Sequence, residues 1–148
     1  MRARGFTLVE LLVAMGIVTI LTTMAVPSYR HAMHRAQRLD ARLALQRIQY
    51  LQERHYAQYL RYAARLGGGR DSPDSLAMPE QSETGSYELS LMAGEGGQTF
   101  TAMAQARAGG RQADDLSCRQ LAIDDAGLRR SADAAGNWSS ADPQRCWG

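Results

Sequence analysis

The sequence contains no lysine, only two cysteines, and no segment that recurs at a fixed period. The lack of a repeat excludes a fibrous or solenoid protein, and a hydrophobic content of 45% excludes a disordered tail. No nucleophile elbow, phosphate loop or zinc-binding spacing occurs, and residues 94–97 do not match a dinucleotide fingerprint. An enzyme is therefore not expected. The length of 148 residues is typical of one domain.

Charge is missing from one long segment near the N-terminus. Residues 11–26 carry none, and Glu10 is the only ionisable side chain in residues 6–26. As a helix those residues extend roughly 32 Å, enough to cross a hydrocarbon core of about 30 Å. This length argues against a cytosolic soluble enzyme. Because Arg2 and Arg4 precede the run, the positive-inside rule places the N-terminus in the cytoplasm and everything after Pro27 outside.

The other charges are unevenly distributed. Residues 30–65 hold eight arginines against two acids, whereas residues 70–148 hold seven arginines against twelve acids. The sequence therefore predicts a basic rod joined to an acidic head.

Three interpretations of the apolar run compete. The first is a secretory signal, because small residues lie near Ala25 where signal peptidase would cut. The second is a plain membrane anchor. The third starts from Glu10, because a carboxylate inside a membrane span costs a few kcal/mol or more and needs a partner. Neither of the first two interpretations supplies that partner.

The residues around Glu10 read Gly5-Phe6-Thr7-Leu8-Val9-Glu10-Leu11-Leu12. This string closely resembles the class III signal of type IV prepilins. In that family a prepilin peptidase cuts after the glycine and methylates the new amino terminus, and the apolar helix stays on the mature protein. The resemblance implies a leader of residues 1–5, cleavage between Gly5 and Phe6, and methylation of Phe6. It also implies an assembly salt bridge between Glu10 and the amino group of Phe6 on a neighbouring subunit.

An amphipathic pattern follows Pro27. Apolar residues recur at three- and four-residue steps of one helix face, which should be buried. These are Ala41, Ala44, Leu45, Ile48, Leu51, His55, Tyr59, Tyr62 and Leu66. We expect one curved helix from Phe6 to about Leu66, with a hydrophobic transmembrane and assembly half at 6–29 and an amphipathic half at 30–66. Pro27 can kink this helix without ending it, and the glycines at 67–69 should stop it.

The remaining residues, 67–148, predict a loop and an antiparallel sheet. Residues 71–85 have the composition of a connecting loop. Alternation predicts strands at 87–92 and 99–107 around a turn at 94–97, and a shorter hairpin at 121–124 and 128–131. About four strands should cover the helix stripe. The fold class is α+β, and the long helix on a small sheet resembles the type IV pilin fold.

The two cysteines, Cys118 and Cys146, allow one disulfide, which an extracytoplasmic head favours. Closing this loop should stabilise the head by roughly 3 to 4 kcal/mol. The cysteine-bounded segment again resembles pilins. Residues 52–58 and the terminal Cys146-Trp147 are similar to PilE-type minor pilins in particular.

Other candidate sites favour structural explanations. His31 and His34 lie one turn apart outside the membrane and His55 lies on the apolar stripe, and no other ligands accompany them, so neither a metal nor a cofactor is expected. The acid pairs at 114–115 and 124–125 are interpreted as solvated turns rather than a calcium site. Arginines gather on two helix flanks: Arg47, Arg54, Arg61 and Arg65 on one, and Arg35, Arg38 and Arg42 on the other. Packing and inter-subunit pairing explain them better than DNA binding does, although cationic stripes bind phosphate.

The sequence therefore predicts a minor pilin of a type IV pilus, stored in the inner membrane and then assembled into the surface filament or priming it. The resemblance implies other pilins, the prepilin peptidase and the inner-membrane assembly platform as partners. Two alternatives stay open: a DNA-binding pilin for natural transformation, and a type II secretion pseudopilin.

Overall fold

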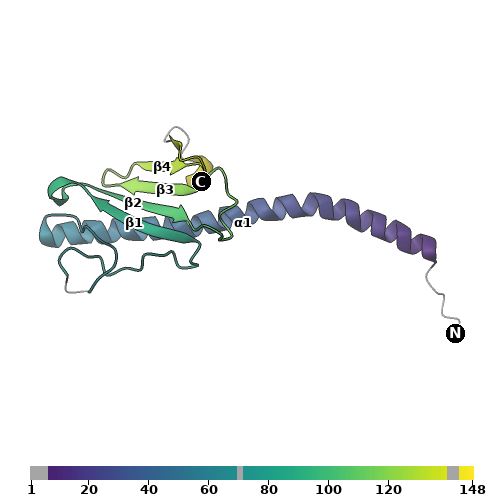
Figure 1. Cartoon of the computed structure of the whole chain (residues 1–148), viewed down its shortest axis with the longest axis horizontal. Coiled ribbons are helices and arrows are strands. Elements are labelled where there is room, and N and C mark those ends of the chain that lie inside the picture. The colour runs from purple at the N-terminus through teal and green to yellow at the C-terminus, as the bar shows by residue number, and fades with distance from the viewer. Residues whose placement is uncertain (1–6, 70–71, 140–143) are drawn as a thin grey trace. The chain divides into compact units, whose positions relative to one another are not determined.

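The computed structural model describes residues 7–69, 72–139 and 144–148. The chain divides into two compact units, Met1–Arg35 and Ala36–Gly148. We call the second unit the head. Helix α1, Leu8–Tyr59, begins in the first unit and ends in the second (Figure 1). The predicted leader, the cleavage site at Gly5 and Phe6, and the methylation site at Phe6 lie outside the described residues.

The described part of the first unit is a helical segment with an apolar surface. All of its residues from Leu8 to Arg30 are exposed, and many of them are large aliphatic residues. Helix α1 is the one described helix that is long and apolar enough to cross a membrane. Thr19 and Thr22 donate their hydroxyls to carbonyl oxygens four residues earlier, at 2.8 and 2.7 Å, so these polar groups are satisfied within the helix. The helix runs through Pro27. The kink we expect there stays a prediction.

Within the head, one face of α1 is buried as the periodicity predicts. Ala41, Leu45 and Ile48 are fully buried, and His55 is 7% exposed. The predicted stripe is confirmed up to His55. Tyr59 is half exposed, and Tyr62 and Leu66 follow the helix rather than forming part of it.

The predicted end of α1 at about Leu66 is wrong, because the helix stops at Tyr59. Leu60 takes a left-handed φ of 55°, and the backbone N–H of Tyr62 then donates to the carbonyl of Gly97 at 2.8 Å. Gly97 itself has φ 68°, and a Cβ there would approach the carbonyl oxygen of Tyr62 to 3.3 Å. Contact with a distant turn therefore ends the helix before the glycine run is reached.

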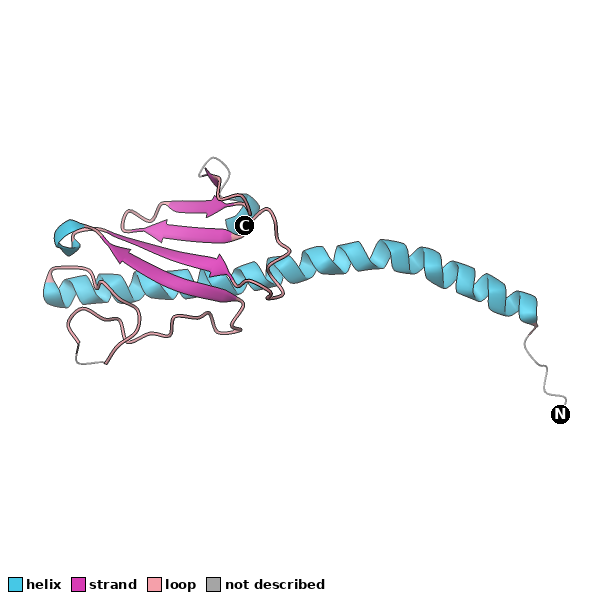
Figure 2. Cartoon of the chain, viewed as in Figure 1, coloured by secondary structure: helices cyan, strands magenta, loops and turns pink. Residues whose placement is uncertain are grey.

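The head contains one antiparallel sheet of five strands in the order β1-β2-β3-β4-β5 (Figure 2). The strands are β1 Tyr87–Ala93, β2 Phe100–Ala106, β3 Gln120–Asp124, β4 Arg129–Ala132 and β5 Trp138–Ser139. The first two are joined by the 3-10 turn η1, Glu95–Gly97. The four predicted strands are confirmed within two residues at each end, and β5 is additional.

The inner face of the sheet packs against the buried face of α1. Tyr87, Phe100, Ala102, Ala104 and Leu121 are all less than 2% exposed and belong to the same core cluster as Leu45 and Ile48. The predicted α+β class, a long helix packed on a small antiparallel sheet, is confirmed.

Candidate functional site

The helix N-terminus carries a reciprocal cap built from Thr7 and Glu10. The Glu10 backbone N–H donates to Thr7 Oγ1 at 3.3 Å. In return, the Thr7 backbone N–H and hydroxyl both donate to Glu10 Oε2, each at 3.1 Å. This is a capping box, which satisfies N–H groups that an isolated helix end leaves unpaired. Glu10 therefore has a partner inside its own chain, which the sequence analysis missed although Thr-x-x-Glu is a known capping pattern.

The C-terminal end of the chain is fixed to the head by a disulfide and by arginines of α1. The disulfide joins Cys118 and Cys146, whose Cα atoms lie 5.6 Å apart, and both cysteines are buried. The predicted pairing is confirmed. Helix α2, Gln144–Trp147, contains the second cysteine. Arg42 donates to the carbonyl oxygens of Trp147 and, at 2.8 Å, of Gly148.

Arg38 makes the most buried ion pair among the described residues. Its Nε and Nη2 donate to the two carboxylate oxygens of Asp115 at 2.6 and 2.8 Å. Asp115 is 4% exposed, so the interpretation of this residue as part of a solvated turn is wrong. The carboxylate also accepts the amide of Gln112 and the backbone N–H of Cys118. Asp115 is thus the hub that connects the helix to the disulfide.

His55 fixes the segment that follows the helix. Its two ring nitrogens lie 2.8 and 2.9 Å from the carbonyl oxygens of Arg61 and Pro73. Gln52 is fully buried and exchanges two hydrogen bonds with the backbone of Ala63. The ring of His55 therefore contacts backbone carbonyls, the structural environment that the sequence analysis favoured. Within the described residues no cluster of three or more His, Cys, Asp or Glu side chains could hold a metal.

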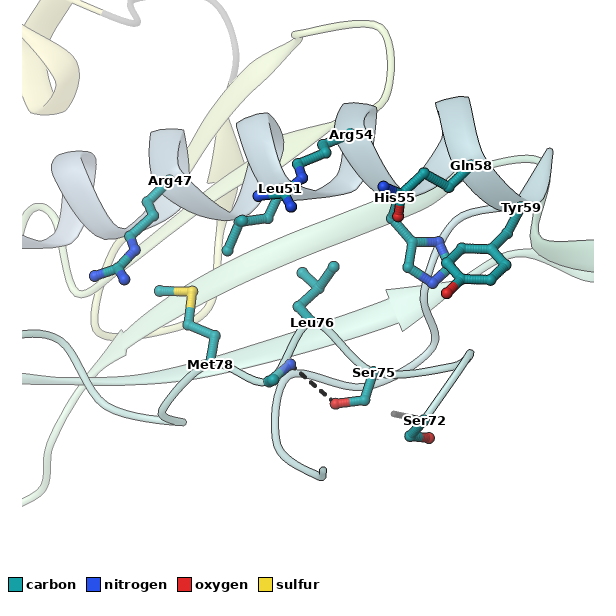
Figure 3. A pocket seen from close by; sticks show the side chains of 11 residues that line it. Arg47, Leu51, Arg54, His55, Gln58, Tyr59, Ser72, Ser75, Leu76 and Met78 are labelled. Atoms are coloured by element: carbon teal, nitrogen blue, oxygen red, sulfur yellow. Dashed lines mark hydrogen bonds between the residues drawn. The ribbon is translucent and has the colours of Figure 1, made fainter. Parts of the chain in front are cut away.

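A cleft of about 460 Å³ lies between α1 and the loop at 72–78 (Figure 3). The helix contributes Arg47, Arg54 and Gln58, and the loop contributes Ser72 and Met78. None of the described lining residues is acidic. Arg47 and Arg54 are exposed, as expected for the helix flank to which the sequence analysis assigned them. Arg61, which was placed on the same flank, instead pairs with Asp74 at 2.9 Å.

Two family models match the chain. Residues 1–26 match the prokaryotic N-terminal methylation motif. Residues 27–122 match the type IV minor pilin ComP, DNA uptake sequence receptor. A comparison with curated proteins found no match. A solved type IV pilin from Shewanella oneidensis is 25% identical over 72% of this chain and 98% of that one, with a TM-score of 0.48. Because the second family model covers well over half of the sequence, the chain belongs to the family of type IV minor pilins that this model describes.

Proposed function

We propose that this minor pilin is made as a prepilin, cut between Gly5 and Phe6, and methylated on the new amino terminus. It is held in the inner membrane with that terminus in the cytoplasm, and is then extracted into the pilus by the assembly platform. The observation that carries the proposal is the exposed apolar helix surface from Leu8 to Val26, which lies within the matched methylation motif at residues 1–26. Such a surface needs lipid before assembly and neighbouring helices afterwards. Its role is structural, with no catalytic turnover.

Glu10 changes partner in this account. In the single chain its carboxylate is occupied by the Thr7 backbone and hydroxyl. In the filament it pairs with the amino group of Phe6 on a neighbouring subunit. At about 4 Å and an effective dielectric near 20, that pair attracts by roughly 4 kcal/mol before desolvation is subtracted. This sets the stagger of the subunits, and helix packing supplies most of the association energy.

The test is the amount of the chain in sheared pili and its N-terminal sequence. Wild-type cells should yield pili that contain the chain beginning at Phe6, and a strain without the assembly platform should retain it in the inner membrane. A chain beginning at Val26 would support the secretory signal instead. A chain absent from pili but required for type II secretion would identify a pseudopilin.

A second candidate function is capture of DNA, because the matched family of minor pilins is described as a DNA uptake sequence receptor. Arg47 and Arg54 give the cleft a cationic wall suited to phosphate. The measurement is duplex DNA binding by intact pili at about 150 mM salt, where counterion release weakens nonspecific binding. Submicromolar binding that is lost in Arg47→Ala/Arg54→Ala pili would support capture. Weak binding that disappears at this salt concentration would leave the structural role alone.

A further inference from the structure

One face of α1 in the head combines exposed apolar side chains with arginines. Leu39, Leu43, Arg47, Tyr50 and Arg54 follow one another at steps of four, four, three and four residues, which places them on one side of the helix. Leu39 is 48% exposed, Leu43 56% and Tyr50 67%. We call these five residues the Leu–Arg face. It points away from the core formed by Ala41, Leu45 and Ile48.

The arginines of this face differ from four others in the head. Arg38, Arg61, Arg107 and Arg130 each form an ion pair with a carboxylate of the same chain. Arg47 and Arg54 make no ion pair or side-chain hydrogen bond within the described part of the head. Both line the cleft beside the loop at 72–78 (Figure 3). Their guanidinium groups are therefore available to a carboxylate from another molecule.

We propose that the Leu–Arg face docks a neighbouring pilin that presents a carboxylate flanked by apolar side chains. The inference rests on the proposed function, because it takes the chain to be surrounded by other pilins. Leu39, Leu43 and Tyr50 would pack against the apolar side chains of the neighbour. Arg47 and Arg54, which line the cleft, would bind the carboxylate of the neighbour. Arg and Tyr are enriched in protein interfaces, where a guanidinium binds a carboxylate through two parallel hydrogen bonds.

Charge complementarity favours this occupant. In this chain residues 70–148, which contain the sheet, carry twelve acids against seven arginines, so the sheet region of a pilin of similar composition is an acidic neighbour. The described lining of the cleft carries arginines and no acid. A duplex DNA would use the arginines but would gain nothing from covering Leu39, Leu43 and Tyr50. The apolar part of the face therefore favours a protein over a nucleic acid.

The experiment compares incorporation of the full-length chain into pili. Arg47→Glu/Arg54→Glu reverses both charges and should lower the ratio of chain in sheared pili to chain in the membrane by about tenfold or more. The matched control, Arg65→Glu/Arg111→Glu, makes the same charge change at two exposed arginines outside the face. It should retain at least about half of wild-type incorporation, because rim or solvent charges contribute little. Arg47→Lys/Arg54→Lys should fall between them, since lysine keeps the charge but not the planar fork.

A photo-crosslinking amino acid at Tyr50 then identifies what covers the face. We expect an adduct with another pilin, through a peptide that contains Asp or Glu. Wild-type incorporation of the charge-reversed chain, or an adduct with a protein other than a pilin, would overturn the inference while the proposed function stands. Pilus-bound DNA that is lost in the charge-reversed variant at unchanged incorporation would also overturn it, in favour of DNA capture. Absence of the wild-type chain from pili would contradict both the proposed function and the inference about the Leu–Arg face.

Discussion

Arg38 on α1 and Asp115 in the loop before β3 form a two-point ion pair across 77 positions of sequence. The arginine is 16% exposed and the carboxylate 4% exposed. Because Asp115 also accepts the backbone N–H of Cys118, one buried carboxylate connects the helix to the disulfide-bonded segment. The C-terminal region is thereby held to α1 by side chains and to the loop before β3 by the disulfide.

Arg38→Ala should strongly destabilise the head, because it leaves Asp115 buried without its cationic partner. Breaking such a pair costs about 3 to 5 kcal/mol of unfolding free energy. Thermal and denaturant unfolding of the full-length chain in detergent measures this loss. Arg111→Ala, at an exposed arginine, serves as the control and should change stability by less than about 0.5 kcal/mol. Equal stability of the two variants would show that Asp115 is solvated after all.

Removal of the disulfide should also loosen the head. Cys118→Ser/Cys146→Ser should lower the unfolding free energy by roughly 3 to 4 kcal/mol, since the closed loop is 28 residues in sequence separation. Unfolding of the oxidised wild type and of the double variant under identical conditions gives the difference. Non-reducing peptide mapping provides the control, and two free thiols in the wild type would contradict the assignment.

Local patterns were sufficient to predict most of the fold. The apolar run, the helix stripe up to His55 and the four main strands all follow from periodicity, because one face of each element is buried. The end of α1 was mispredicted because it depends on tertiary contacts. Gln52 and His55 bind the backbone of the segment after the helix, and the carbonyl of Gly97 accepts a hydrogen bond from the backbone N–H of Tyr62. Glycine preferences at 67–69 do not report those contacts.

The structure of the sites was less accessible to sequence reasoning. Asp115 has the sequence context of a surface acid, because Arg38, whose charge compensates for its burial, is far away in sequence. Strand β5 has two residues and α2 has four, which is too short for any periodicity. The Thr7–Glu10 cap, by contrast, follows from its Thr-x-x-Glu spacing, which is the pattern of a capping box.

High pH should weaken the head through Tyr87. Burial, followed by the nearby charge of Asp115, raises the pKa of its phenol above the ordinary value. A raised folded-state pKa contributes stability that is fully present below the unfolded value near pH 10 and is lost as pH rises further. The unfolding free energy should therefore fall above about pH 10, and Tyr87→Phe should fall less steeply over that range. Parallel pH curves for the two proteins would contradict the assignment.

Substitutions at the helix N-terminus should separate the two roles of Glu10, which are capping the helix and pairing with a neighbouring subunit. Glu10→Ala should leave leader cleavage and membrane insertion largely intact but reduce incorporation into pili by about tenfold, because the inter-subunit pair is lost. Thr7→Val removes the hydroxyl of the cap at a cost of about 1 kcal/mol and keeps the carboxylate. It should therefore incorporate better than Glu10→Ala. Quantitative immunoblots of the membrane and sheared-pilus fractions give both ratios, and normal incorporation of Glu10→Ala would sink the pairing model.

The central claim, that this chain is a processed subunit of the pilus, is tested most directly by intact-mass spectrometry of purified sheared pili. The account predicts one low-abundance species that begins at Phe6, carries one methyl group on its amino terminus, and contains the bond between Cys118 and Cys146. Detection of the chain only in the membrane or periplasmic fraction, or with an N-terminus at Val26, would contradict it.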